Sequence, residues 1–90
     1  MIDVGLPGAD LVERGLADLA RGKPSAEALL VSIGAPRLTR LGVEVKRPFS
    51  RPERRLWELL ARDDPDAAHA RYNALVRRLV SFEDALACVA

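Results

Sequence analysis

The chain has 90 residues, of which 49% are hydrophobic and 30% are charged, and its formal net charge is +1. This balance excludes intrinsic disorder, which combines low hydrophobicity with high net charge, and it predicts one small folded domain with a shallow core. A single cysteine excludes an internal disulfide framework, and no apolar run reaches the roughly 18 residues of a membrane span, so we expect a cytoplasmic protein.

The fold class predicted from composition and periodicity is all-α. Aromatic residues are only 4% of the chain, so the core must consist mainly of Leu, Val and Ala, which suits helices better than sheets. We expect a single domain, residues 1–90, built as a small bundle of about four helices plus one short helical segment. Residues 1–6 are a candidate arm, and residues 43–51 are expected to form a loop.

The first half of the chain predicts three helical segments, which span residues 7–22, 26–33 and 36–41. Gly15, in the middle of the first segment, either weakens that helix or permits close packing there. Ser25 is the expected N-cap of the second segment, and Pro36 is well placed to begin the third.

A fourth helix is expected to begin at Pro52, because Ser50 and Glu53 are three residues apart, as in a capping box. It is predicted to run through Arg62, with Leu56, Leu59 and Leu60 on one side and Trp57 at the edge of that side. Asp64 and Pro65 then suit the N-cap and the first residue of a further helix.

The last quarter of the chain, residues 65–90, carries the strongest helical pattern. Apolar residues recur at alternating steps of four and three, which is typical of an amphipathic helix with a narrow apolar seam. The seam residues are Ala68, Tyr72, Leu75, Leu79, Phe82, Leu86 and Val89. We expect this helix to fold back antiparallel on the preceding one, because both apolar faces need covering.

The flank of this long helix is the candidate partner-binding surface, because Arg71 and Arg78 border the apolar seam as charged residues border an interface. The predicted partner-binding residues are His69, Arg71, Tyr72, Val76, Arg78 and Val80. The partner is expected to be another protein chain, either a second copy or an acidic protein that this chain inhibits. Ordinary solvation of a helix gives the same charge pattern and remains an alternative.

Nucleic-acid binding is the alternative function, because residues 37–55 carry seven basic side chains against two acidic ones. The candidate contacts are Arg37, Arg40, Lys46, Arg47, Arg51, Arg54 and Arg55. Segments 26–33 and 36–41, with Gly34 between them, also suggest a helix-turn-helix. Six residues are short for a recognition helix, however, and a pI near 8.0 favours an acidic protein partner over DNA.

The sequence predicts no catalytic residues, no metal site and no cofactor. His69 is the only histidine, and Cys88 has no cationic or thiol neighbour in sequence to activate it. Arg62, six intervening residues, His69 and then Tyr72 resemble the Arg-x4–6-His pattern of HEPN-type ribonucleases, which would imply RNA cleavage as a further alternative. That pattern has Asn after its Arg, where this chain has Asp63.

Two stretches resemble small helical bacterial proteins encoded beside nucleotidyltransferase-type toxins. They are EALLVSIGAPRLTRLGV, residues 27–43, and DAAHARYNALVRRLVSFEDAL, residues 66–86. The resemblance implies an antitoxin-like protein, which lays a helix face against the toxin and blocks its nucleotide or RNA site. It agrees with the small core and with the absence of a predicted catalytic set.

Overall fold

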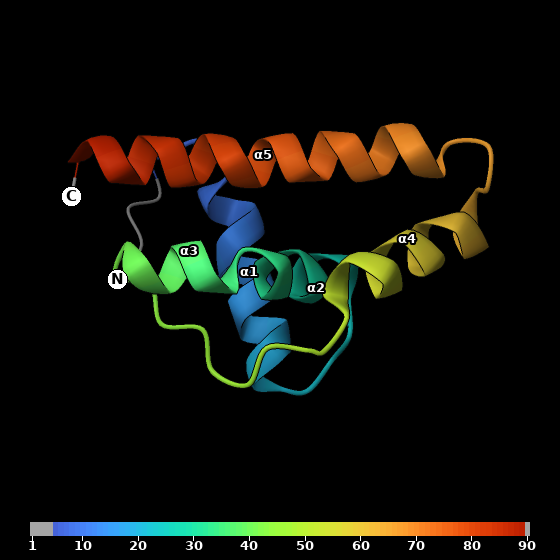
Figure 1. The fold of residues 1–90 in the computed structure, drawn as a ribbon, viewed down its shortest axis with the longest axis horizontal. Helices are drawn as coiled ribbons and strands as arrows, with labels where there is room; N and C mark the ends of the chain where they lie inside the picture. Colours follow the sequence, from blue (N-terminus) through green and yellow to red (C-terminus); the bar gives the residue numbers. More distant parts are fainter. Residues whose placement is uncertain (1–4, 90) are drawn as a thin grey trace.

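A computed structural model describes residues 5–89, in which there are five α-helices and no strand (Figure 1). The helices are α1 (Ala9–Ala20), α2 (Ala26–Ile33), α3 (Ala35–Arg40), α4 (Pro52–Asp63) and α5 (Ala68–Val89). The predicted all-α bundle with a long C-terminal helix is therefore confirmed. Most of the candidate arm at residues 1–6 lies outside the described residues. Among the residues described, no helix has both the length and the apolar character needed to cross a bilayer.

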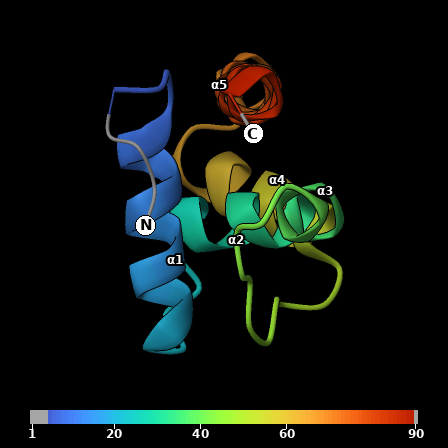
Figure 2. The same ribbon diagram turned by 90° about the vertical axis from the view of Figure 1, so that its left-hand side faces the viewer.

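Long helix α5 forms one layer of the molecule and lies over α2, α3 and α4 (Figure 1). Viewed along α5, α1 stands on one side of it, whereas α3 and α4 lie below it, with α3 toward the opposite side (Figure 2). Helix α5 therefore has one flank that faces α1 and one flank on the opposite side, above α3 and α4.

The N-cap of α1 is Gly8, where the backbone meets α5. Gly8 has φ 77°, a left-handed conformation that side chains rarely adopt, and a Cβ there would lie 2.8 Å from the carbonyl oxygen of Arg78. A glycine at this position lets the start of α1 approach the backbone of α5. Gly15 has the same role where α1 crosses α2, because a Cβ there would lie 2.4 Å from the carbonyl oxygen of Glu27. The close packing that Gly15 suggested is present.

The predicted N-cap of α2 is also present. The backbone N–H of Ala28 donates to Ser25 Oγ at 3.1 Å. Ser25 Oγ–H in turn donates to Asp18 Oδ2 on α1 at 2.7 Å, so one hydroxyl starts α2 and ties it to α1. Gly34 is the single residue between α2 and the six-residue α3.

Residues 41–51, between α3 and α4, contain no helix or strand, but polar contacts hold them against α2. The backbone N–H of Phe49 donates to the buried Ser32 Oγ at 3.0 Å, and Ser32 Oγ–H donates to the carbonyl of Ala28 at 2.8 Å. The Arg55 guanidinium lies 4.9 Å from the centre of the Phe49 ring. These contacts fix the chain just before α4.

The predicted starts of three helices need correction. Helix α1 begins at Ala9 and not at Pro7. Helix α4 begins at Pro52 as expected, but its N-cap is Arg51 in a left-handed conformation (φ 48°), and no side chain caps it. The Ser50–Glu53 capping box is therefore wrong, because a true N-cap has extended backbone. Helix α5 begins at Ala68 and not at Pro65. The Asp64 carboxylate accepts from the N–H groups of Asp66 and Ala67 at 3.1 and 3.3 Å, which stabilises a turn before the helix.

The core lies where the five helices meet, and α3 contributes Leu38 to it. Its largest fully buried side chains are Phe82, Leu29, Leu30, Leu38, Leu56, Val12 and Val31. Along the predicted seam of α5, Ala68, Leu79 and Phe82 are buried, whereas Tyr72, Leu75 and Leu86 are partly buried. Val89, the last seam residue, is 64% exposed, so the seam ends one step earlier than its periodicity predicts.

Candidate functional site

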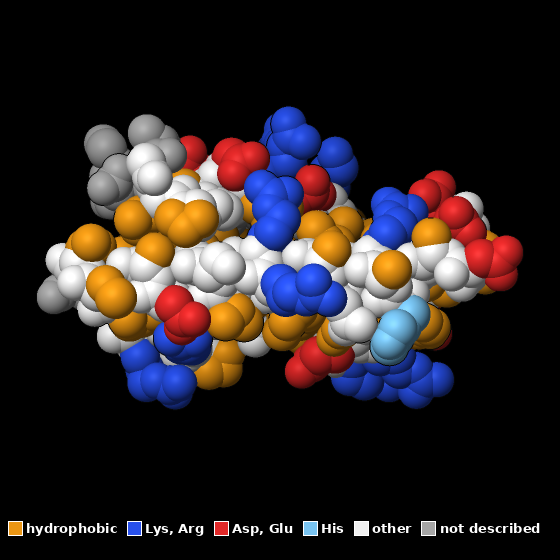
Figure 3. Space-filling model, turned by 90° about the horizontal axis from the view of Figure 1, so that it is seen from above, with side chains coloured by type: hydrophobic (Ala, Val, Ile, Leu, Met, Phe, Trp, Pro, Cys, Tyr) orange, Lys and Arg blue, Asp and Glu red, His pale blue; other side chains and the backbone are white. Residues whose placement is uncertain are grey.

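The flank of α5 that faces away from α1 carries several of the predicted partner-binding residues. Tyr72, Val76 and Val80 follow one another at four-residue intervals, so they form a continuous row on the helix. Tyr72 and Val76 are partly buried, and Val80 is 39% exposed. Hydrophobic side chains interrupt the charged ones along the edge of α5 that carries His69 (Figure 3). We call His69, Tyr72, Val76 and Val80 the α5 flank.

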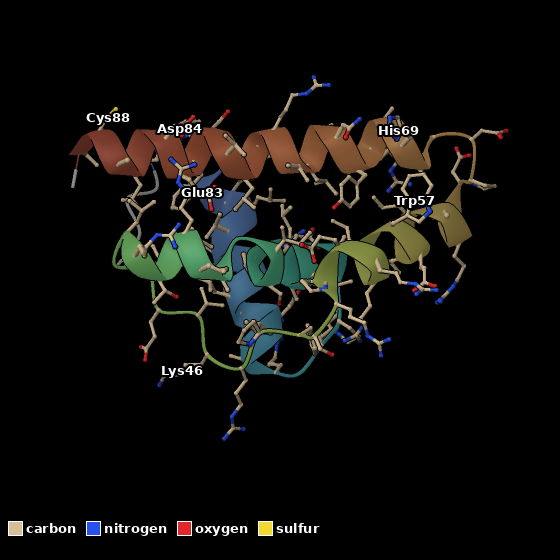
Figure 4. All side chains as sticks on the ribbon, in the orientation of Figure 1. Lys46, Trp57, His69, Glu83, Asp84 and Cys88 are labelled. Atoms are coloured by element: carbon tan, nitrogen blue, oxygen red, sulfur yellow. The ribbon has the colours of Figure 1, made fainter. Side chains whose placement is uncertain are left out.

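An aromatic cluster closes one end of the α5 flank. Trp57 of α4 lies beneath His69 of α5 (Figure 4), with ring centroids 6.2 Å apart and planes at 73°. Trp57 also packs edge-on against Tyr72 at 6.4 Å, yet 40% of the tryptophan remains exposed. Burial, with a smaller effect of Glu53, raises the pKa of Tyr72 above its usual value.

His69 itself is exposed and shares a hydrogen bond of 3.3 Å with Asn73. Its imidazole therefore contacts one aromatic ring and one amide. Within residues 5–89, no group of three or more metal-ligating side chains comes together. The two residues of the predicted ribonuclease pattern, Arg62 and His69, do not share a site. Arg62 lines a hollow with Pro24 and Leu29 on the α2 side of α4, whereas His69 contacts Trp57 on another side of that helix.

Arg71 and Arg78, predicted with the α5 flank, lie on the other border of the helix. Arg71 Nη1 pairs with Asp63 Oδ2 at 2.6 Å, and Arg78 Nη2 pairs with Asp10 Oδ1 of α1 at 3.3 Å. Both arginine side chains remain about half exposed, at 47% and 50%. The structure therefore divides the predicted partner-binding set between two borders of α5, and the two arginines already have acidic neighbours within the chain.

Arg37, a member of the predicted nucleic-acid set, joins α3 to α5 through two side-chain hydrogen bonds. Its guanidinium donates to Asp84 Oδ1 at 2.7 Å and to Glu83 Oε1 at 3.4 Å. Glu83 points from α5 toward α3 (Figure 4) and is only 4% exposed. Burial raises the pKa of Glu83 although Arg37 opposes that rise, and the hydrogen bond to Asp84 raises the pKa of Arg37.

The other members of the nucleic-acid set separate by position. Lys46 is on the loop below the helices, away from α5 (Figure 4), and pairs with Glu44 at 3.8 Å. Arg40 and Arg47 are exposed, and neither has an ion pair with the described residues. The remaining three, Arg51, Arg54 and Arg55, gather at the start of α4.

Arginines at the start of α4 and along it line two adjoining hollows. Arg51, Arg54, Arg55 and Glu58 line a hollow of about 290 Å³. A second hollow, of about 240 Å³, shares Arg55 and Glu58 and is completed by Arg62, Leu59, Pro24 and Leu29. We call Arg51, Arg54, Arg55 and Arg62 the α4 arginine face. Sequence reasoning missed Arg62 here, although it lies seven residues after Arg55 and therefore on the same side of the helix.

The hollow at the junction of α1 and α2 was not predicted either. It has a volume of about 450 Å³ and is lined by Arg14, Ala17, Asp18, Arg21, Lys23, Ser25 and Glu27. Asp18 is 4% exposed and accepts from Ser25 and, at 2.9 Å, from Arg21. The hydrogen bond from Ser25 lowers the pKa of Asp18, with Arg21 and Lys23 acting in the same direction. These satisfied contacts explain Asp18 as a structural residue of the α1–α2 junction.

Comparison with known proteins gave no match to this chain among protein-family models, curated proteins or solved structures.

Proposed function

We propose that this chain is a non-enzymatic interaction module that binds another protein chain through the α5 flank. The observation that carries the proposal is the incomplete burial of the longest helix. Only Ala68, Leu79, Phe82 and Glu83 are buried among the 22 residues of α5. The Tyr72–Val76–Val80 row instead passes from the core to the surface on the side of α5 away from α1.

The composition of the α5 flank suits a protein partner. Interfaces are enriched in aromatic residues around an apolar centre, with polar groups at the rim. Tyr72, Val76 and Val80 supply the apolar centre, and His69 with Asn73 supplies polar groups at one end. Arg71 and Arg78 form the opposite border, where an acidic partner would compete with Asp63 and Asp10.

The resemblance of residues 27–43 and 66–86 to antitoxin-like proteins leads us to propose an inhibitory complex with the product of an adjacent gene. The second stretch includes the whole α5 flank, so the resemblance and the exposed surface concern the same helix. Self-association through the same flank is the alternative form of this function.

Replacement of Val80 tests the proposal. Val80→Glu places a charge in the apolar row, and because Val80 is 39% exposed the change should cost about 0.5 kcal/mol or less of folding stability. We expect it to abolish co-purification with the co-expressed product of the adjacent gene.

Ser81→Glu is the matched control, because the next residue points to the exposed outer side of α5. This variant should keep the complex. If Val80→Glu and Ser81→Glu retain the partner equally well, the α5 flank is not the binding surface.

A further inference from the structure

The hollow between α2 and α4 combines two guanidinium groups with an apolar wall. It has a volume of about 240 Å³. Its lining residues, which we call the α2–α4 hollow, are Pro24, Leu29, Arg55, Glu58, Leu59 and Arg62. Leu29 is 1% exposed and Leu59 packs against the core, so the apolar wall is part of the folded interior. Leu59 follows Arg55 by four residues and precedes Arg62 by three, which places it between the two arginines on the helix surface.

The charge balance of the α2–α4 hollow sets it apart. Four other hollows in the described chain each contain an ion pair between two of their own lining residues. These pairs are Arg21 with Asp18, Arg14 with Glu27, Arg78 with Asp10, Lys46 with Glu44 and Arg54 with Glu58. In the α2–α4 hollow the one carboxylate, Glu58, pairs at 3.9 Å with Arg54, which does not line it. Positive charge therefore remains beside an apolar wall.

Arg55 is held in place at this hollow. Its guanidinium lies 4.9 Å from the centre of the Phe49 ring, and the Phe49 backbone N–H donates to the buried Ser32 Oγ at 3.0 Å. Arg55 is also partly buried, whereas Arg47 and Arg77 are exposed. A guanidinium that is already positioned loses less side-chain freedom on binding, and its planar donors match a carboxylate. We therefore expect Arg55 to receive the anionic group of a ligand.

The size and lining of the hollow favour a small ligand with a charged end and an apolar body. A water molecule occupies about 30 Å³ in the liquid, so the hollow has room for roughly eight non-hydrogen atoms. Small-molecule sites are mostly apolar, with a few polar groups that fix the orientation of the ligand. A polyanion would leave Leu29 and Leu59 without an apolar contact, and a neutral hydrocarbon would leave Arg55 without an anion.

We propose that the α2–α4 hollow binds a small amphiphilic carboxylate. The carboxylate accepts hydrogen bonds from Arg55, the hydrocarbon chain packs against Leu29 and Leu59, and Arg62 adds positive charge at the far end of the hollow. The α5 flank lies on another side of α4, where Trp57 contacts His69. The proposal therefore does not depend on the protein-binding function.

Octanoate is the probe, and NMR spectra of the isotope-labelled protein locate its binding site. Titration should shift the backbone amide signals of Leu29, Arg55 and Leu59, with a Kd on the order of 1 mM. Hexanoate should bind about threefold to tenfold more weakly, because two methylene groups fewer are buried. Acetate and hexanol should give no saturating shift at about 10 mM, because each supplies only one of the two features.

Three variants test the assignment of the charged end. Arg55→Gln should weaken octanoate binding by about tenfold or more, because the carboxylate loses its charged donor. Arg55→Lys keeps the charge and should lose only about threefold. Arg62→Gln, at an exposed position, should lose about twofold to fourfold. Circular dichroism checks that the helices are kept.

The matched control is Arg47→Gln with Arg77→Gln, which removes two exposed arginines that lie outside the α2–α4 hollow. It should leave the affinity for octanoate within about twofold.

Three results would overturn the proposal: no shift of the hollow's signals at about 10 mM octanoate, acetate binding as tight as octanoate binding, or a loss in the control equal to that of Arg55→Gln. A peptide with a C-terminal leucine that binds the hollow when octanoate does not would also overturn it, and would assign the hollow to a protein chain.

Discussion

At the scale of single residues, Glu83 carries a carboxyl group into the contact between α3 and α5. Its side chain is 5% exposed and lies 3.4 Å from the Arg37 guanidinium. Gly34 leaves room for it, since a Cβ on that residue would lie 3.0 Å from Glu83 Oε2. Removing a carboxylate from water disfavours its charged form, and the ion pair with Arg37 only partially opposes this effect.

Glu83 should therefore make folding stability depend on pH. Its pKa is raised in the folded protein, so the folded state holds the proton more tightly than the unfolded state does. The contribution of this group to stability is fully present below the unfolded pKa and is lost as pH rises through the folded pKa. Glu83→Gln removes that dependence, so the stability of wild type relative to the variant should increase as pH falls through the raised pKa of Glu83 toward the unfolded value of about 4.3.

Urea unfolding of both proteins at several pH values measures this difference, and it cancels the opposite contribution of Asp18, whose pKa is lowered. A difference that stays constant across that pH range would show that Glu83 does not titrate as its burial implies.

At the scale of elements, the helices were predictable where a local pattern is sufficient. The seam of α5 follows from its four–three spacing, and Ser25 as N-cap of α2 follows from residue type. The capping box predicted at Ser50 is wrong because the preceding residue, Phe49, donates a backbone hydrogen bond to Ser32 on α2. Alongside this distant contact, Arg51 adopts a left-handed backbone conformation. Sequence spacing carries no information about such a contact.

Candidate sites were less predictable than helices for the same reason. Arg71 and Arg78 were correctly placed on the surface of α5, but their pairing with Asp63 and Asp10 depends on how the helices pack. Arg62 joins Arg51 and Arg55 only when α4 is treated as one surface across the whole helix. The aromatic cluster likewise depends on the α4–α5 hairpin, which brings Trp57 to His69.

The junction of α1 and α2 provides a prediction at this scale. Ser25→Asn should keep stability within about 0.5 kcal/mol, because asparagine also caps helices and its amide can donate to Asp18. Ser25→Ala should lose about 1 kcal/mol through the missing cap.

Ser25→Asp would normally be an equally good cap, but here it places a second carboxylate beside Asp18 Oδ2, which lies 2.7 Å from the serine oxygen. At neutral pH, the loss of folding stability in Ser25→Asp should at least equal the loss in Ser25→Ala. Thermal or urea unfolding of the three variants tests this order of stability. If Ser25→Asp were as stable as Ser25→Asn, Asp18 would not be a partner of residue 25 at the α1–α2 junction.

At the scale of the whole molecule, the bundle covers the start of α5 with α4 and its middle with α1 and α2. It leaves two different surfaces open. The α5 flank is an apolar row with an aromatic end, and the α4 arginine face is a line of guanidinium groups. A small domain has limited surface to bury within itself, and these two surfaces are where we expect binding partners.

The molar mass of the purified protein in solution, alone and co-expressed with the product of the adjacent gene, tests the central proposal most directly. The single chain has a mass of 9.8 kDa. We expect light scattering to give a larger mass, that of a complex or a self-associated form, and we expect Val80→Glu to return the chain to 9.8 kDa while Ser81→Glu does not. A mass of 9.8 kDa for the unaltered chain under both conditions would contradict binding through the α5 flank.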